Sequence, residues 1–203
     1  MHKFAPAILA LSIGALTASC ASAQAQNQGH DHAAMDHSAH AAAEAPARAT
    51  AGATGHATLI NGEGAELGTV TLSQGATGLL IKVEATGLTP GWHGIHLHAT
   101  GQCEAPFTSA GSHIKHNTDG VHGLLNPQGP DNGDLPNVYA DATGKVMAEV
   151  FTPRARIADQ GPGEWLYDAD GSALVIHANP DDHTSQPIGG AGDRVACAVL
   201  KAH

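Results

Sequence analysis

Basic and aromatic side chains are scarce in this sequence of 203 residues. Lys and Arg number 9 against 19 Asp and Glu, which gives a formal net charge of −10, and aromatic residues make up only 3%. Such a chain has no general electrostatic attraction to nucleic acid or to an anionic membrane, so we expect no nucleic-acid partner. The sequence also lacks a stretch with a convincing long helical period, whereas it contains 25 Gly and 11 Pro. This composition favours a loop-rich β fold over a helical bundle.

The apolar run near the start of the chain is too short to span a bilayer. It extends from Phe4 to Leu16, after Lys3 and before a stretch of small residues, which is typical of an export signal. We predict a signal peptide over residues 1–23, with an A-x-A cleavage pattern at 21–23 or 23–25. Alternatively, residues 17–20 form a loose lipoprotein processing site, and Cys20 carries a lipid. Either way the protein is periplasmic or otherwise extracytoplasmic, and it associates with the membrane only if Cys20 is lipidated.

Three cysteines are present, and Cys20 falls within the predicted export segment. The remaining pair, Cys103 and Cys197, would then reside in an oxidising compartment, which predicts a disulfide. That bond would close a loop of about 95 residues, for which loop-closure entropy gives an upper figure of about 4–5 kcal/mol.

Residues 24–53 are rich in Ala and contain almost no large apolar side chains, so they cannot bury enough surface to fold alone. We expect a disordered tether here. Imidazoles and a thioether lie close together within it and could capture copper or zinc without any fold. The residues concerned are His30, His32, Met35, His37 and His40. The alternative is a polar linker with no such role.

Short runs with β character recur from Thr54 onward, separated by Gly, Asn and Pro. In the run Leu79–Ala85 the odd positions are apolar, whereas Lys82 and Glu84 would point to the opposite face. We therefore predict an all-β domain over residues 54–203, an antiparallel sandwich or barrel. Two long segments, Thr100–Ala140 and Thr152–Gly171, would be loops, and loops of that length in a compact domain are usually functional.

Fifteen histidines are an unusual number for one chain, and several could share a metal. His96 and His98 would lie on one face of a strand, because residues i and i+2 of a strand point the same way. The first long loop then supplies further ligands, and a metal ion could order a loop with so little apolar content. These ligands are His113, His122, Asp131 and Asp134, with His177 at the end of a later strand.

Four motifs, in this order and spacing, resemble those of the copper–zinc superoxide dismutase family over roughly residues 54–200. They are Gly91-Trp92-His93-Gly94-Ile95-His96-Leu97-His98, Ser109-Ala110-Gly111-Ser112-His113, Gly129-Pro130 with Gly133-Asp134-Leu135-Pro136-Asn137, and Gly189-Gly190-Ala191-Gly192-Asp193-Arg194-Val195-Ala196-Cys197. The resemblance is to the bacterial, exported type. It implies a Greek-key β-barrel or sandwich with long metal-binding and electrostatic loops.

The resemblance also implies a role for each matching residue. Copper would be held by His96, His98, His113 and His177, and zinc by His113, His122 and Asp134. His113 would be the imidazolate shared by the two metals. On reduction it would be released from copper and protonated, and it would then return that proton. Asp181 would link a copper histidine to a zinc histidine, and Arg194 would guide the anionic substrate. Cys103 and Cys197 would form the family's disulfide.

One position departs from the family pattern. The family has a third zinc histidine in Gly-Pro-His-x-Gly-Asp, where this chain has Asp131. Zinc accepts carboxylate oxygen, although structural zinc sites favour nitrogen and sulfur, so Asp131 could be the fourth ligand. Alternatively His116 completes the site, or the site is weak, empty or otherwise occupied.

The resemblance implies dismutation of superoxide to O2 and hydrogen peroxide by a redox-cycling copper beside a structural zinc, which would protect the cell envelope. The catalytic residues would be Arg194 and His113. The alternative is a non-catalytic copper-binding or copper-delivery protein on the same fold, which the His-rich tether and the altered zinc site favour. A pure carrier has no use for Arg194, so we favour the enzyme. A homodimer is an open expectation.

Overall fold

The computed structural model describes residues 50–202, and these residues form strands joined by long loops. The strands are β1 (Thr54–Asn61), β2 (Glu66–Gln74), β3 (Leu79–Ala85), β4 (Gly91–His93), β5 (Ile95–His98), β6 (Val138–Ala140), β7 (Val146–Thr152), β8 (Ala155–Arg156), β9 (Glu164–Trp165), β10 (Ser172–His177) and β11 (Arg194–Leu200). A short 3-10 helix, η2 (Thr108–Ala110), is the one helical element in the described range. Nothing between residues 50 and 202 is a helix long and apolar enough to cross a membrane. The prediction of an all-β fold is confirmed.

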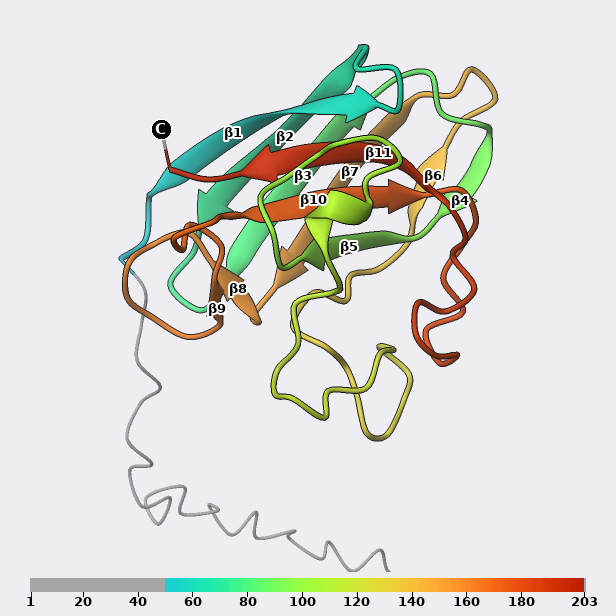
Figure 1. Ribbon diagram of the computed structural model, residues 1–203. Coiled ribbons are helices and arrows are strands. Elements are labelled where there is room, and N and C mark those ends of the chain that lie inside the picture. Colours follow the sequence, from blue (N-terminus) through green and yellow to red (C-terminus); the bar gives the residue numbers. More distant parts are fainter. Residues whose placement is uncertain (1–49, 203) are drawn as a thin grey trace, which may run out of the picture. The chain divides into compact units, whose positions relative to one another are not determined.

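Seven strands form one curled antiparallel sheet in the order β5-β10-β11-β1-β2-β3-β7 (Figure 1). The predicted alternation along β3 is confirmed, because Leu79, Ile81 and Val83 are fully buried whereas Lys82 is exposed. Each β3 residue has a partner on both sides, so Val83 lies opposite Val70 of β2 and Ala148 of β7. Side chains on one face of these strands therefore form a continuous apolar surface.

The two edges of this sheet are brought together by a second, two-stranded sheet. One residue separates β4 from the edge strand β5, and a tight turn at Asp141–Lys145 joins β6 to the opposite edge strand β7. β4 and β6 pair with each other. This pairing closes the sheet at one end into the half-barrel seen in Figure 1. Closure removes much of the exposed strand edge that an open sheet would present.

The interior of the curl is the main hydrophobic core, built from Leu, Ile and Val side chains of β1, β2, β3, β5, β7, β10 and β11. A second, smaller cluster lies on the outer face of β10 and β11, where Phe107 and Ala110 cover Ala173, Val175 and Cys197. The loop that follows β5 is therefore packed against the outside of the sheet. The disulfide between Cys103 and Cys197, with a Cα–Cα distance of 5.7 Å, fastens it there. This confirms the predicted pairing.

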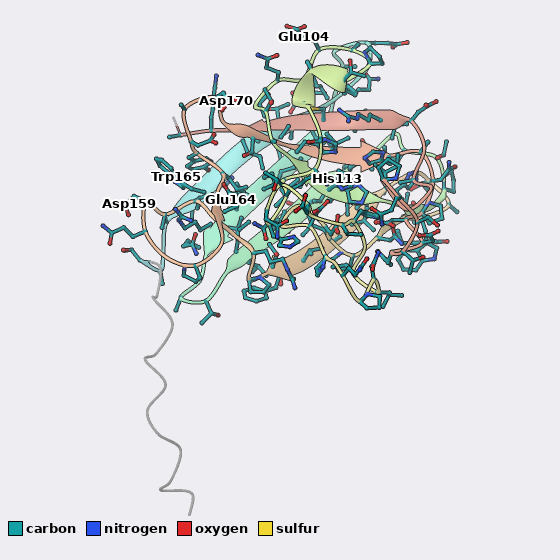
Figure 2. All side chains as sticks on the ribbon, turned by 60° about the horizontal axis from the view of Figure 1, so that its bottom comes forward. Glu104, His113, Asp159, Glu164, Trp165 and Asp170 are labelled. Carbon is teal, nitrogen blue, oxygen red and sulfur yellow. A yellow bond between two sulfur atoms is a disulfide. The ribbon has the colours of Figure 1, made fainter. Side chains whose placement is uncertain are left out.

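Three long loops carry most of the remaining chain. Residues 99–137 follow β5 and residues 178–193 follow β10, and Figure 1 shows both on the side of the domain next to β5 and β4. Residues 153–171 lie elsewhere: their backbone is held by the buried Gln74, whose Oε1 accepts from Ile157 N at 2.8 Å. Figure 2 shows Asp159, Glu164, Trp165 and Asp170 of this segment away from His113. Only the first two loops can contribute to one site.

The tether was predicted to end at residue 53, and β1 begins at Thr54. The chain is already hydrogen-bonded to the sheet just before that point, because Gly52 N donates to Gln74 O at 2.9 Å. The predicted signal peptide, the lipid-accepting Cys20 and the metal-capturing residues from His30 to His40 lie outside the described residues, so these stay predictions.

Candidate metal centre

The edge strand β5 provides the first two histidines of the site. Ile95 and Leu97 point into the core, so His96 and His98 point to the outer face, and both imidazoles are fully buried by the loops. On the neighbouring strand, Ala173 and Val175 lie opposite His98 and His96. His177 has the same parity as these two residues, and the irregularity in pairing between Ile176 and His177 lies at the strand end. The β period of two therefore gathers three histidines on one face.

The free edge of β5 is occupied by the loop that follows it, which returns twice alongside the strand. Ile114 N donates to Leu97 O at 3.0 Å and Leu97 N donates to Gly133 O at 2.8 Å. These contacts place His113 beside His98 and Asp134 beside His96 as isolated bridges. Gly133 is required for this approach, because a Cβ there would lie 2.2 Å from Leu97 O.

Four histidines converge on one point. His96, His98, His113 and His177 each offer a ligand atom, and these atoms all lie within 4.8 Å of one another. In each ring one nitrogen is buried with no hydrogen-bond partner, namely His96 Nδ1, His98 Nε2, His113 Nε2 and His177 Nε2. The other nitrogen of each ring contacts an oxygen at 2.8–3.1 Å, on Asp181, Gly111, Asp134 and Gly192 respectively.

Buried polar atoms without a partner are costly, so four of them facing one another need a common partner. An outward N–H bond to an oxygen leaves the inward nitrogen with a free lone pair, which is the tautomer that a metal-binding imidazole requires. Four imidazole nitrogens also suit copper in both of its common oxidation states. The residues present therefore fit a copper ion.

A second group shares His96 and His113 with the first. It consists of His96, His113, His122 and Asp134, again with ligand atoms within 4.8 Å of one another. Asp134 Oδ1 contacts His122 Nδ1 at 2.7 Å and His113 Nδ1 at 3.1 Å, whereas Oδ2 accepts from the main-chain N–H of Gly123 and Asp131. The carboxylate is thus oriented so that one oxygen and two Nδ1 atoms face one another. That donor set of nitrogen and oxygen fits zinc.

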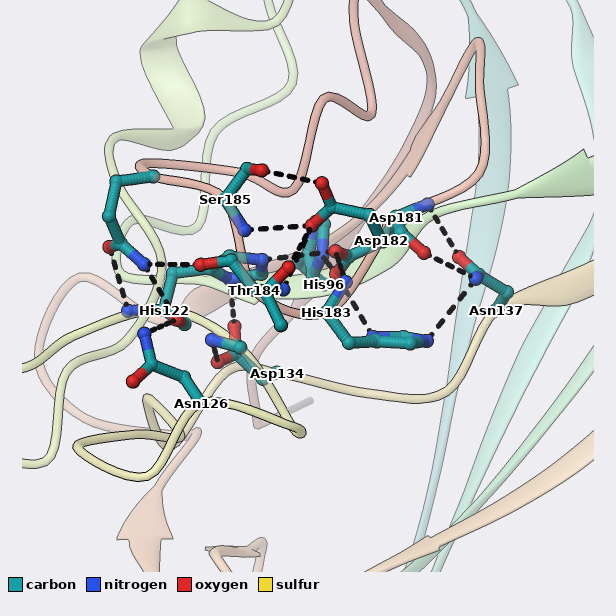
Figure 3. A network of polar contacts seen from close by, with 12 residues as sticks. His96, His122, Asn126, Asp134, Asn137, Asp181, Asp182, His183, Thr184 and Ser185 are labelled. Atoms are coloured by element: carbon teal, nitrogen blue, oxygen red, sulfur yellow. Dashed lines mark hydrogen bonds and ion pairs between the residues drawn. The ribbon is translucent and has the colours of Figure 1, made fainter.

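Asp181 joins the two groups (Figure 3). Its Oδ2 contacts His96 Nε2 at 2.8 Å and its Oδ1 contacts His122 Nε2 at 3.1 Å. Asn137 holds the backbone of Asp181 from both sides, because Nδ2 donates to Asp181 O and Oδ1 accepts from Asp181 N, both at 2.8 Å. Asp181 therefore fixes the orientation of His96, which belongs to both groups, and of His122, which belongs to the second alone.

Burial and hydrogen bonding shift the pKa values of the site histidines in opposite directions. Burial lowers the pKa of His96 to about 3, that of His98 to about 2 and that of His177 to about 4. Burial acts in the same direction on His122, but its hydrogen bonds to Asp134 and Asp181 prevail and raise the pKa to about 9. His96, His98 and His177 are thus neutral and ready to bind a metal, whereas His122, between the carboxylates of Asp134 and Asp181, favours its protonated form.

The metal-free protein is expected to lose stability as the pH falls from 6.5 to about 5. In this window the unfolded chain protonates His96, His98 and His177, while the folded protein resists, so acid favours unfolding by up to about 1.4 kcal/mol per histidine and pH unit. His122 is protonated in the folded state throughout this window, and its stabilisation is lost only as the pH rises through about 9. The melting temperature of chelator-treated protein should fall by at least about 5 °C over this pH range. Metal-loaded protein is the comparison: it should melt at a higher temperature, but its melting temperature should fall at least as steeply with acid, because bound metal also keeps the rings neutral in the folded state. A constant melting temperature in the metal-free protein contradicts the assignment.

Arg194 is half-buried beside the first group. Its Nη1 donates to Phe107 O at 2.6 Å and its Nη2 donates to Gly111 O at 2.7 Å, and Gly111 O also contacts His98 Nδ1. The guanidinium therefore has a fixed position next to a histidine of the first group. It lines a hollow in the surface together with Ser112, His113, Lys115, Asp131, Pro187 and Ile188. A small anion entering this hollow would meet a cation beside the four histidines.

The two residues predicted as alternative fourth ligands of zinc, Asp131 and His116, lie in different surroundings. Asp131 is buried, but no oxygen of its carboxylate belongs to either group of mutually close ligand atoms. Its Oδ2 lies 3.3 Å from Lys115 Nζ, and its Oδ1 has no partner. His116 is exposed and is also outside both groups. Both assignments stay predictions.

Sequence reasoning gave no role to three polar residues that shape the site. His93 is buried with Nδ1 2.6 Å from His177 O and Nε2 2.8 Å from Thr89 O, so it ties the end of β10 to the chain before β4. Asn137 and His183 hold Asp181. His93 and Asn137 lie within motifs quoted above, whereas no sequence signal distinguishes His183.

Comparisons with known proteins agree with this geometry. A family model described as copper/zinc superoxide dismutase matches residues 66–200. A superoxide dismutase (Cu-Zn) of Caulobacter vibrioides is 52% identical over 141 residues, which covers 69% of this chain and 81% of that protein. A second such enzyme, from Aquifex aeolicus, is 44% identical over 149 residues and covers 72% and 85%.

Solved structures show the same likeness. A superoxide dismutase-like protein of Bacillus subtilis superposes with a TM-score of 0.67 at 35% identity, over 73% of this chain and 99% of that one. The copper/zinc enzyme of Brucella abortus superposes with a TM-score of 0.59 at 30% identity, over 73% and 100%. The matched region thus spans nearly all of those chains.

Proposed function

The chain belongs to the copper/zinc superoxide dismutase family, and we propose that its activity resides in the two groups of ligand residues that share His96 and His113. Members of this family convert superoxide to O2 and hydrogen peroxide, with copper and zinc as cofactors. The observation that carries the assignment of the site is the set of four buried ring nitrogens that face one another without a protein partner.

Copper would be held by His96 Nδ1 and by the Nε2 atoms of His98, His113 and His177. When bound, copper supplies the one-electron redox cycling in which one superoxide is oxidised and a second is reduced. The protein keeps the rings of His96, His98 and His177 neutral by burial, and it orients each of the four rings through an oxygen that contacts the ring's other nitrogen. Neutral, fixed ligands leave little to reorganise between oxidation states.

Zinc would be held by His113 and His122 through Nδ1 and by Asp134 through Oδ1, with Asp131 as the proposed fourth ligand. Support for Asp131 comes from its burial, from the unpartnered Oδ1, and from its main-chain N–H, which donates to Asp134 Oδ2 at 2.9 Å. That bond keeps the Asp131 backbone next to the zinc group, which consists of His113, His122 and Asp134.

His113 is proposed to handle the proton. Its Nε2 faces the other members of the copper group, which are His96, His98 and His177, and its Nδ1 faces Asp134. Nε2 can therefore hold a proton while the ring stays anchored at Nδ1. Hydrogen peroxide formation consumes protons, and His113 is one of the residues that line the hollow into which the substrate would enter. Arg194 would bind and orient the superoxide anion there.

An assay of superoxide consumption with copper-loaded protein distinguishes the enzyme from a copper carrier on the same fold. Full activity with copper bound supports the enzyme, whereas stoichiometric copper without activity supports the carrier. The position of Arg194, fixed by two main-chain oxygens at the mouth of the copper group, favours the enzyme.

Arg194→Ala is expected to lower kcat/KM for superoxide by about 10-fold at low ionic strength, because the fixed cation that attracts the anion is lost from an acidic protein. Inhibition by small anions should weaken in parallel. Arg154→Ala removes the same charge from the loop between β7 and β10 and serves as the control. Equal rates for both variants at low salt would reject the role of Arg194.

We also propose that the protein works outside the cytoplasm, in the periplasm or envelope, where it would protect the envelope from superoxide. The export-type sequence at residues 1–23 and the disulfide, which an oxidising compartment favours, support this. Fractionation of the source cells tests it, and recovery in the cytoplasm alone would reject it. Lipidation at Cys20, metal capture by the histidines of the tether and a homodimer stay predictions.

A further inference from the structure

Lys115 and Asp131 form an ion pair in the wall of the substrate hollow. Lys115 Nζ lies 3.3 Å from Asp131 Oδ2 and donates to Gly120 O at 2.8 Å. The two side chains differ in burial: that of Lys115 is 42% exposed and that of Asp131 is 1% exposed. The ammonium therefore reaches in from solvent to compensate a buried carboxylate.

The carboxylate of Asp131 is only half satisfied by this pair. Its Oδ1 is buried and has no hydrogen-bond partner, although buried carboxylate oxygens normally have one. The space around Oδ1 is left by Gly120, where a Cβ would lie 2.4 Å from that oxygen. The ion pair thus leaves Oδ1 of Asp131 without a hydrogen-bond partner, so the carboxylate is available to a cation that binds it more strongly than Lys115 does.

The zinc group lies next to Asp131 along the chain and in space. The main-chain N–H of Asp131 donates to Oδ2 of Asp134, and Oδ1 of that same carboxylate faces His113 and His122. The backbone of Asp131 is thus anchored to a carboxylate of the zinc group, so exchange of Lys115 for a cation there would proceed by rotation of the Asp131 side chain. A divalent ion attracts a buried carboxylate more strongly than a half-exposed ammonium does.

The same exchange would change the charge in the hollow. Lys115, Asp131 and Arg194 all line it. While Lys115 is paired with Asp131, its charge is largely cancelled for an approaching anion. Once Asp131 leaves, the ammonium acts as a second cation beside Arg194.

We propose that Lys115 and zinc compete for Asp131, so that zinc binding draws the Asp131 carboxylate into the zinc group and releases Lys115 as a second superoxide-attracting cation. This inference rests on the zinc site proposed above. It goes beyond that site by coupling zinc occupancy to the electrostatics of substrate entry through a residue that binds neither metal.

The first test uses the copper-free protein and needs no turnover. Lys115 is acetylated under limiting reagent with and without zinc, and its modification is followed by peptide mass spectrometry. Zinc is expected to raise the modification rate of Lys115 by about 3- to 10-fold, the range expected for loss of one ion pair. Lys145, an exposed lysine in the β6–β7 turn, serves as the internal control and should be unaffected. In Asp131→Asn, Lys115 should react rapidly whether or not zinc is present.

The second test measures zinc affinity by competition with a chelator. Lys115→Met removes the competitor and should tighten zinc binding by about 3- to 10-fold. Asp131→Asn should weaken it by at least about 10-fold. Lys145→Met removes an equal charge elsewhere and should leave the affinity unchanged. With both metals bound, Lys115→Met should slow superoxide consumption at low salt by about 2-fold.

Two results would overturn the inference: Lys115 modification that zinc leaves unchanged, or zinc binding by Asp131→Asn as tight as in the wild type. The zinc affinity of His122→Ala distinguishes failure of this coupling from failure of the zinc site itself. If His122→Ala weakens zinc binding and Asp131→Asn does not, the zinc site stands and the coupling is rejected. If neither variant weakens binding, both are rejected.

Discussion

Asp181→Asn is expected to lower zinc affinity by about 10- to 100-fold, the usual effect of losing an outer partner of metal-binding histidines. The carboxylate accepts from His96 Nε2 and His122 Nε2 at the same time. An amide offers one oxygen acceptor and one NH2 donor, so one of the two rings loses its acceptor and with it the preference for the metal-binding tautomer. Chelator competition on the copper-free protein measures the change directly.

The adjacent Asp182→Asn is the matched control for Asp181→Asn. Asp182 is exposed, and its carboxylate accepts hydrogen bonds from Thr184 and Ser185 but from no histidine. It carries the same charge one position away, so a purely long-range electrostatic effect would appear in both variants. Similar zinc affinities for the two variants would argue against Asp181 as the residue that orients both rings.

Removal of the disulfide is expected to cost about 2–5 kcal/mol of unfolding free energy, because the bond closes a long loop in the unfolded chain. Cys103 and Cys197 are 94 positions apart in sequence. The double variant Cys103→Ser with Cys197→Ser should therefore show a lower denaturation midpoint in urea, and the wild type under reducing conditions should shift by a similar amount. A midpoint equal to that of the oxidised wild type would show that loop packing alone fixes this segment.

The same bond should also affect the site. Residues 103–111 carry the two main-chain oxygens, of Phe107 and Gly111, that hold Arg194, and Gly111 O also orients His98. When this segment loosens, Arg194 loses its fixed position. Anion inhibition of the reduced but folded enzyme should therefore weaken in the manner expected for Arg194→Ala, whereas copper content should be retained by the strand histidines.

Regular strands were predictable from the sequence where apolar and polar residues alternate over enough positions. The predicted alternating run Leu79–Ala85 coincides with β3. The three-residue strands β4 and β6 were not predicted, because three residues define no period. Their pairing depends on the closure of the sheet, which is a tertiary effect. The loop at 178–193 was likewise not singled out, although it carries Asp181.

The site was predictable in part for a similar reason. The period of two places His96 and His98 on one face, but nothing local to the sequence says that His177 lies on the neighbouring strand or that the loop returns along β5. The resemblance to a family supplied that arrangement. It could not supply the environment of Asp131, because this position departs from the family pattern and its contact with Lys115 depends on the fold.

The pairing of β5 with β10 has a consequence for the order of events during maturation. His96 lies opposite Val175, so the strand that completes the copper group is synthesised only after the long loop 99–137 and the strands β6 to β9. Contacts between such distant segments form late and slowly, because a long loop must close first. A nascent chain that ends before β10 therefore has no copper group to fill, and uptake of copper would mark the completion of the sheet.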